Sequence, residues 1–131
     1  IYLETNATFP EALTRVASHL DHVAADIKLS SCTGQESRFE VNREFLELCD
    51  VPDLIVKFVV TDKVVAEEFM QGVDLVAASG RPAVVVIQPA AGRRGEPGVG
   101  PGTLIELQER ALEVCRDVRV IPRVHQMLRL S

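Results

Sequence analysis

The chain has 131 residues, a net charge of -5 and 47% hydrophobic residues, which is the size and composition of one globular domain with a substantial core. The negative charge disfavours unspecific binding to nucleic acid or to anionic membranes, so neither is expected as a partner. The longest apolar run, "PAVVVI", has the length of a strand and is too short to span a membrane. Residues 1–131 are therefore expected to form a single domain.

Apolar residues alternate between strand spacing and helix spacing along the chain. This pattern predicts strands at 1–5, 22–29, 53–61, 82–89 and 117–122, and helices at 10–20, 36–50, 63–78, 104–115 and 123–130. Residues 30–34 are expected to be a loop. Asp62 is expected to cap the third helix, and Thr103 with Glu106 to form a capping box for the fourth. Such regular alternation requires crossover connections, so the predicted fold class is α/β with a parallel sheet of about five strands.

One segment, "PAAGRRGEPGVGPG" at residues 89–102, is too rich in Gly and Pro for a helix or a strand. It is predicted to be a flexible loop. Because it follows the carboxyl end of a strand, it is either a surface loop or part of a binding site. Its "GVGPG" lacks the spacing of a phosphate-binding fingerprint.

The cysteines and histidines offer no metal site by their spacing. Cys32, Cys49 and Cys115 form no CxxC pair, and three such thiols are typical of a cytoplasmic protein in a reducing compartment. His19 and His22 lie at a helix end and a strand start, so they do not share a face.

Polar residues interrupt the strands near their expected carboxyl ends, where parallel α/β proteins bind ligands. They are Glu4, Thr5, Asn6, Asp26, Lys28, Lys57, Thr61, Asp62 and Gln88. One reading is an internal network in which Asp26 or Glu4 neutralises Lys28 or Lys57. The other is a site for a ligand that carries hydroxyls, an ammonium and a carboxylate, as an amino-acid nucleoside does.

Five segments then point to a family. "LETNAT", "DHVAADIKLSSCTG", "VKFVVTD", "VVVIQP" and "DVRVIPRVHQML" follow one another over nearly the whole chain. In this order they resemble the later portion of the 7-carboxy-7-deazaguanine synthases, which are radical S-adenosylmethionine (radical SAM) lyases of queuosine and deazapurine biosynthesis. The closing segment is the most telling of the five.

The resemblance implies part of a (β/α)6 barrel and a radical reaction in the intact protein. Members of the family bind a [4Fe-4S] cluster through a CxxxCxxC loop and reduce S-adenosylmethionine to a 5′-deoxyadenosyl radical. The radical abstracts hydrogen from 6-carboxy-5,6,7,8-tetrahydropterin, and the ring contracts with loss of ammonia to 7-carboxy-7-deazaguanine. Mg²⁺ assists this step.

The resemblance also assigns residues to ligands. For S-adenosylmethionine these are Glu4, Thr5, Asn6, Asp26, Lys28 and Gln88. Thr8, Ser30 and Ser31 would lie on the side of the pterin substrate. No catalytic residue and no metal ligand is assigned within this chain.

Three departures from the family pattern affect these assignments. The Gly that usually follows the Asn is Ala7 here, so the turn is strained if it needs a positive φ. The loop after Gln88 and Pro89 carries Arg93 and Arg94 in unusually Gly-rich surroundings. CxxxCxxC and the glycine-rich segment before the third strand are absent. We therefore expect Ile1 to correspond to the start of the third barrel strand, and this chain alone to be inactive.

Two other readings remain open at this point. One is a relative of the glycyl-radical enzyme activases, which share the cofactor and the cluster but act on a protein. The other is a flavodoxin-like binding module without chemistry. Because the strand–helix units expected before the first strand are missing, that strand would form an open sheet edge, and we expect the chain to self-associate into a homo-oligomer through that edge or through the exposed sheet face.

Overall fold

The structure is a computed structural model that describes residues 2–16, 19–90 and 98–121. In chain order the elements are β1 (Tyr2–Thr5), α1 (Pro10–Val16), β2 (His22–Asp26), α2 (Ser30–Thr33), α3 (Phe39–Leu48), β3 (Asp53–Val60), α4 (Ala66–Ala78), β4 (Ala83–Pro89), α5 (Pro101–Leu112) and β5 (Val118–Val120). Strands and longer helices alternate as the sequence predicts, which confirms the α/β class. Within these residues no helix is long and apolar enough to cross a bilayer.

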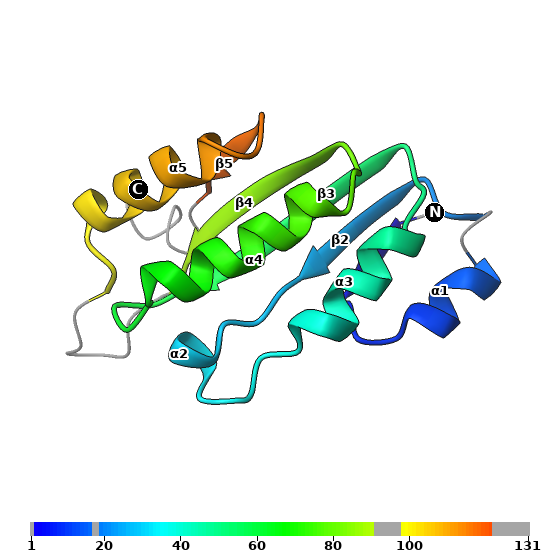
Figure 1. Ribbon diagram of the computed structural model, residues 1–131, viewed down its shortest axis with the longest axis horizontal. Helices are drawn as coiled ribbons and strands as arrows, with labels where there is room; N and C mark the ends of the chain where they lie inside the picture. The colour runs from blue at the N-terminus through cyan, green and yellow to red at the C-terminus, as the bar shows by residue number, and fades with distance from the viewer. Residues whose placement is uncertain (1, 17–18, 91–97, 122–131) are drawn as a thin grey trace, which may run out of the picture.

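The five strands form one parallel sheet in the order β1-β2-β3-β4-β5. Each crossover joins neighbouring strands, so a uniform hand places the helices on one face. Helix α3 contacts α1 and α4, and α4 contacts α5; Figure 1 shows α3 and α4 in front of the sheet. Sequential order is the arrangement of strand–helix units in a (β/α) barrel. A flavodoxin-like sheet has the order 2-1-3-4-5, so that alternative is wrong.

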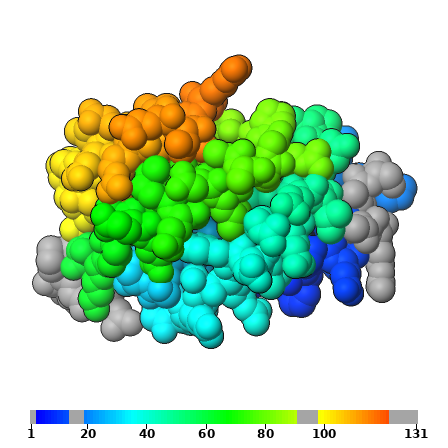
Figure 2. Space-filling view, in the orientation of Figure 1, coloured from blue at the N-terminus to red at the C-terminus, as the bar shows by residue number. Residues whose placement is uncertain are grey.

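The core lies between the sheet and this helix layer, which covers the face seen in Figure 2. On β3 the side chains of Val56, Phe58 and Val60 are fully buried. The ring of Phe58 meets Phe69 of α4 edge to face, with centroids 5.3 Å apart and planes at 71°. Gly72 permits this contact, because a Cβ there would lie 2.6 Å from Phe58 Cε1.

Both predicted helix caps are wrong. Helix α4 begins after Val65 and α5 after Gly100, and neither of these two residues caps its helix with its own side chain. Asp62 is therefore too early to cap α4, and Thr103 lies inside the first turn of α5. Pro101 accounts for the earlier start of α5, since it lacks an N–H and its fixed φ suits the first helical position.

Several boundaries also differ from the prediction; β2, predicted at 22–29, ends at Asp26, and α3, predicted at 36–50, is Phe39–Leu48. Residues predicted as a loop form the single-turn α2 (Ser30–Thr33), closed by Gly34 at φ 74°. The loop predicted at 89–102 is shorter in the structure, because Pro89 belongs to β4 and Pro101 and Gly102 belong to α5. Residues 91–97, with Arg93 and Arg94, and the helix predicted at 123–130 lie outside the described residues.

Candidate functional site

The face of the sheet opposite the helices carries a row of polar side chains. Paired residues of parallel strands direct their side chains to the same face, and neighbours along a strand alternate. Because Val56 and Phe58 face the helices, Lys57 faces the other side. Following the register outward gives Glu4, Asp26, Lys57, Gln88 and Arg119. Lys28 follows the end of β2 and joins them through its ion pair with Asp26. We call these six residues the open face. It draws on all five strands.

The register places these residues at three levels along the strands. Glu4 pairs with Ala24 and lies lowest. Asp26 and Lys57 are direct partners one level higher, and Val86 connects that level to Arg119. Gln88 lies one level further, and Lys28 follows the last residue of β2, so both are at the carboxyl end, where ligands of parallel sheets bind. The sequence had indicated this rim, and the structure brings four of its predicted cofactor residues to one face.

Asp26 and Lys28 form an ion pair, with Asp26 Oδ2 2.7 Å from Lys28 Nζ. The internal network considered from the sequence therefore exists for this pair. It is partly exposed, with side-chain accessibilities of 45% for Lys28 and 22% for Asp26, so it contributes about 1 kcal/mol at most. Asp26 Oδ1 is buried without a hydrogen-bond partner among the described residues.

The turn after β1 has a left-handed residue at its centre. Ala7 is fully buried and has φ 58°, which costs an alanine about 1–2 kcal/mol. The strain considered for this position is therefore present. Asn6 Oδ1 accepts from the Thr8 hydroxyl at 2.6 Å and from the Thr8 amide at 3.3 Å. Asn42 of α3 donates from Nδ2 to the carbonyls of Ala7 (2.8 Å) and Asn6 (3.3 Å).

Thr5, by contrast, pairs with the fully buried Ala25, so its side chain points to the helix-covered side. Its hydroxyl accepts a hydrogen bond from the Ala7 amide at 3.1 Å. In this structure Thr5 shapes the turn and does not reach the open face.

Ser30 and Ser31 are held by a carboxylate that the sequence analysis missed. Glu68 of α4 accepts from the amide and hydroxyl of both serines: 3.1 Å from Ser30 N, 3.0 Å from Ser31 N and 2.6 Å from Ser31 Oγ, with a further short contact from Ser30 Oγ. Burial alone would raise the pKa of Glu68, but these hydrogen bonds lower it below its ordinary value. In return, Ser31 Oγ accepts from the Val65 amide at 3.3 Å, which caps α4 from a distant part of the chain.

A pocket of about 350 Å³ adjoins the turn and the rim. Its lining comprises Asn6, Thr8, Lys28, Gln35, Glu36, Arg38 and Asn42. Three of these were predicted from the sequence. The other four follow α2 or belong to α3, and no periodic signal marked them. The lining is polar throughout, as suits a ligand rich in hydrogen-bonding groups.

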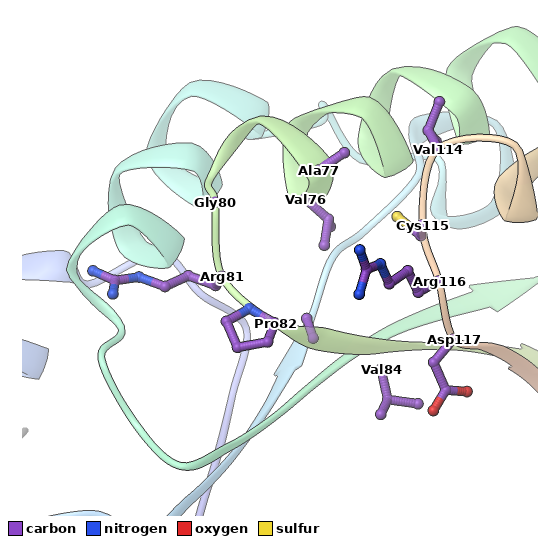
Figure 3. Close-up of a pocket in the computed structure, with 11 residues that line it drawn as sticks. Val76, Ala77, Gly80, Arg81, Pro82, Val84, Val114, Cys115, Arg116 and Asp117 are labelled. Carbon is purple, nitrogen blue, oxygen red and sulfur yellow. The ribbon is translucent and has the colours of Figure 1, made fainter.

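A larger cavity, about 530 Å³, lies at the opposite end of the sheet, around Pro82, Val84 and Asp117 at the starts of β4 and β5. Figure 3 shows Arg116 directed into this space and Arg81 directed away from it. Arg81 instead donates to the carbonyls of Leu46 (3.3 Å) and Glu47 at the end of α3. These hydrogen bonds of Arg81 stabilise the fold, and in (β/α) barrels the residues at the amino ends of the strands generally contribute to stability and not to catalysis. We therefore place the candidate site at the carboxyl end.

No metal site exists in the described part of the chain: no three His, Cys, Asp or Glu side chains there could hold an ion. Two of the three cysteines, Cys49 and Cys115, have thiols whose pKa is shifted by their surroundings. Burial raises the pKa of Cys49 to about 11, an effect that Arg81 opposes and Asp50 reinforces. Burial also raises the pKa of Cys115. Neither thiol is prepared to ligate a metal.

Comparison with known proteins agrees with this geometry. A parallel sheet in sequential order, with a polar face at the carboxyl ends, defines a portion of a (β/α) barrel enzyme fold. The chain is similar to the 7-carboxy-7-deazaguanine synthase of Geobacter sulfurreducens, with 30% identity over 128 residues, which is 98% of this chain and 51% of that enzyme. The chain thus spans about half of the relative's length and resembles that portion of it. No protein-family model matches the chain.

Of the two cofactors that the resemblance implies, S-adenosylmethionine fits the described residues and a [4Fe-4S] cluster does not. S-adenosylmethionine carries an ammonium and hydroxyls that can donate to the partly exposed Asp26 carboxylate, and a carboxylate that can pair with Lys28, so the open face suits it. A [4Fe-4S] cluster does not fit, because the sequence has three cysteines and no CxxxCxxC. No reaction step is therefore assigned to a cluster on these residues.

Proposed function

We propose that this chain is the cofactor- and substrate-facing part of a radical SAM enzyme that converts 6-carboxy-5,6,7,8-tetrahydropterin to 7-carboxy-7-deazaguanine. The observation that carries the proposal is the polar open face, which coincides with the segments that resemble the synthases. The relative's name supports the same reaction. S-adenosylmethionine would supply the hydrogen-atom abstraction from the substrate, given one electron from a cluster that other parts of the whole protein would hold.

The chain's own residues would bind and orient the two ligands. The partly exposed Asp26 carboxylate accepts from a ribose hydroxyl or from the ammonium, and Lys28 pairs with the carboxylate of the methionine moiety. Glu4 lies on the neighbouring strand β1, and Gln88 lies on β4, with β3 between it and β2. Asn6 and Thr8 lie at the boundary between the open face and the polar pocket, so the pterin would approach from there. Cluster ligands, and groups for Mg²⁺, would come from beyond the described residues or from the substrate.

Binding of S-adenosylmethionine to the chain tests the cofactor part of the proposal. Asp26→Asn should raise the dissociation constant about tenfold or more, because the ligand loses a charge-assisted hydrogen bond. Its unfolding free energy should fall by about 1 kcal/mol at most, since the ion pair is partly exposed. Isothermal titration calorimetry measures the first quantity and urea denaturation the second.

Asp53→Asn provides the matched control. Asp53 lies on the same face but at the amino end of β3, paired with His22 at 2.9 Å. Its substitution should leave the dissociation constant within twofold of the wild-type value. Equal binding by Asp26→Asn and the wild type, or no binding by either, would contradict the proposed cofactor site.

The reaction itself is tested on the gene product that contains this chain. The coding sequence upstream of Ile1 should encode CxxxCxxC within about 100 residues, the length of roughly two strand–helix units. That protein, reconstituted anaerobically with iron and sulfide, should form 7-carboxy-7-deazaguanine from the pterin, as detected by mass spectrometry. An unrelated upstream sequence would remove the basis for the proposed reaction.

A further inference from the structure

Asn42 is a deeply buried polar residue at the candidate site, 2% exposed. It belongs to the first turn of α3, where its own amide donates to the Arg38 carbonyl at 2.9 Å. Phe45 and Leu46, one turn further, are buried in the core. The backbone that carries Asn42 is therefore fixed independently of the turn that its side chain touches.

The direction of the Asn42 carboxamide is set by its partners. Nδ2 lies 2.8 Å from the Ala7 carbonyl oxygen and 3.3 Å from the Asn6 carbonyl oxygen. An oxygen in that position would face two other oxygens, so only the NH₂ group satisfies them. Both donor hydrogens are thus used to hold two successive carbonyls of one turn.

Those two carbonyls flank the strained residue. Ala7 has φ 58°, a conformation that glycine adopts without steric strain and alanine does not. When the turn is held, Asn6 directs its side-chain oxygen to Thr8, and both residues line the polar pocket. If Ala7 returned to negative φ, the chain direction after Asn6 would change, and Asn6 and Thr8 would leave their places.

We propose that Asn42 is the positioning residue for Asn6 and Thr8: it holds the turn in the left-handed conformation and so keeps both side chains at the ligand site. It acts through the turn and touches no reacting atom. This inference rests on the proposed function for the identity of the ligand, but the geometry of the turn can be measured without any ligand.

Two readouts test the inference. In Asn42→Ala, hydrogen exchange of the Ala7 and Thr8 amides should accelerate about tenfold or more, because the turn opens locally. The dissociation constant for S-adenosylmethionine should rise by a similar factor. Adding Ala7→Gly should restore binding to within about threefold of wild type, since glycine adopts the left-handed turn without the hydrogen bonds from Asn42. Ala7→Gly alone should change binding less than twofold.

Leu46→Ala is the matched control, on the same helix and equally buried. It should lower thermal stability at least as much as Asn42→Ala, yet leave the Ala7 and Thr8 amides and the dissociation constant unchanged. If Asn42→Ala behaves as Leu46→Ala does, or if Ala7→Gly gives no rescue, Asn42 is merely structural and the inference is overturned. If the wild type binds no S-adenosylmethionine but the exchange results hold, the proposed function fails while the positioning role stands.

Discussion

The two faces of the sheet carry different kinds of side chain, apolar on one and largely polar on the other, and adjacent residues of β3 show both. Phe58 is fully buried against α4, whereas Lys57, next to it, lies on the open face beside Asp26 and Val86. The helix-covered face obtains its order from shape and apolar contact. The open face carries polar side chains from all five strands, and within the described residues one buried carboxylate oxygen there, Asp26 Oδ1, has no hydrogen-bond partner. The first face therefore maintains the fold, and the second remains available for a ligand.

The largest effect should come from breaking the helix-covered face. Phe58→Ala removes a ring packed on Phe69 and leaves a cavity, which should cost about 3–5 kcal/mol of unfolding free energy. Lys57→Met, one residue away, should change it by only about 0.5 kcal/mol. Urea denaturation followed by circular dichroism measures both. Comparable losses in the two variants would mean that the faces do not differ in this way.

An intermediate effect is expected at the link between α2 and α4. Glu68→Gln leaves the Ser30 and Ser31 donors without a full set of acceptors and should cost about 1–3 kcal/mol at neutral pH. Because the folded pKa of Glu68 is lowered from 4.5, the stabilisation is fully present above pH 4.5. It is lost as the pH falls through the lower folded pKa.

Urea titrations of wild type and Glu68→Gln between pH 7 and pH 3 measure this difference. Glu67→Gln is the control, since Glu67 is the exposed neighbour on the same helical turn. Its stability should follow that of the wild type across the range. A gap between wild type and Glu68→Gln that persists unchanged at pH 3 would show that the carboxylate charge is not the source of the stabilisation.

The sequence was informative where the cause is periodic and local. Alternating runs such as "DLIVKFVV" predicted the strands, and the polar ends of the same runs predicted the rim. The apolar pattern alone could not give the strand order, because barrel and flavodoxin-like sheets share the same alternation, and only the family resemblance indicated the barrel. The order of the strands in the sheet, with each strand beside the one before it in the chain, distinguishes the barrel from the flavodoxin-like sheet.

The missed features depend on partners distant in the chain. Glu68 reads as an ordinary acidic residue in a first helical turn, yet its donors lie 37 and 38 residues earlier. Asn42 reads as a poor helix former, yet it acts 35 and 36 residues away. The predicted caps failed for a related reason, since Ser31 provides for α4 what a local cap would have provided. Local propensity cannot reveal such contacts.

The smallest effect concerns self-association, which we expect to use the open face. Ile55 on that face is 38% exposed, and the charges beside it are of both signs, so a second copy can bring Asp26 toward Lys57 or Arg119. Ile55→Lys should weaken association about tenfold or more, the equivalent of one buried aliphatic side chain. Ile105→Lys is the control, because Ile105 is 54% exposed on α5, in the helix layer. Sedimentation velocity over a range of concentrations distinguishes the two. If both variants weaken association equally, the open face is not the interface; if the wild type is monomeric throughout, the open face does not need a second copy to cover it.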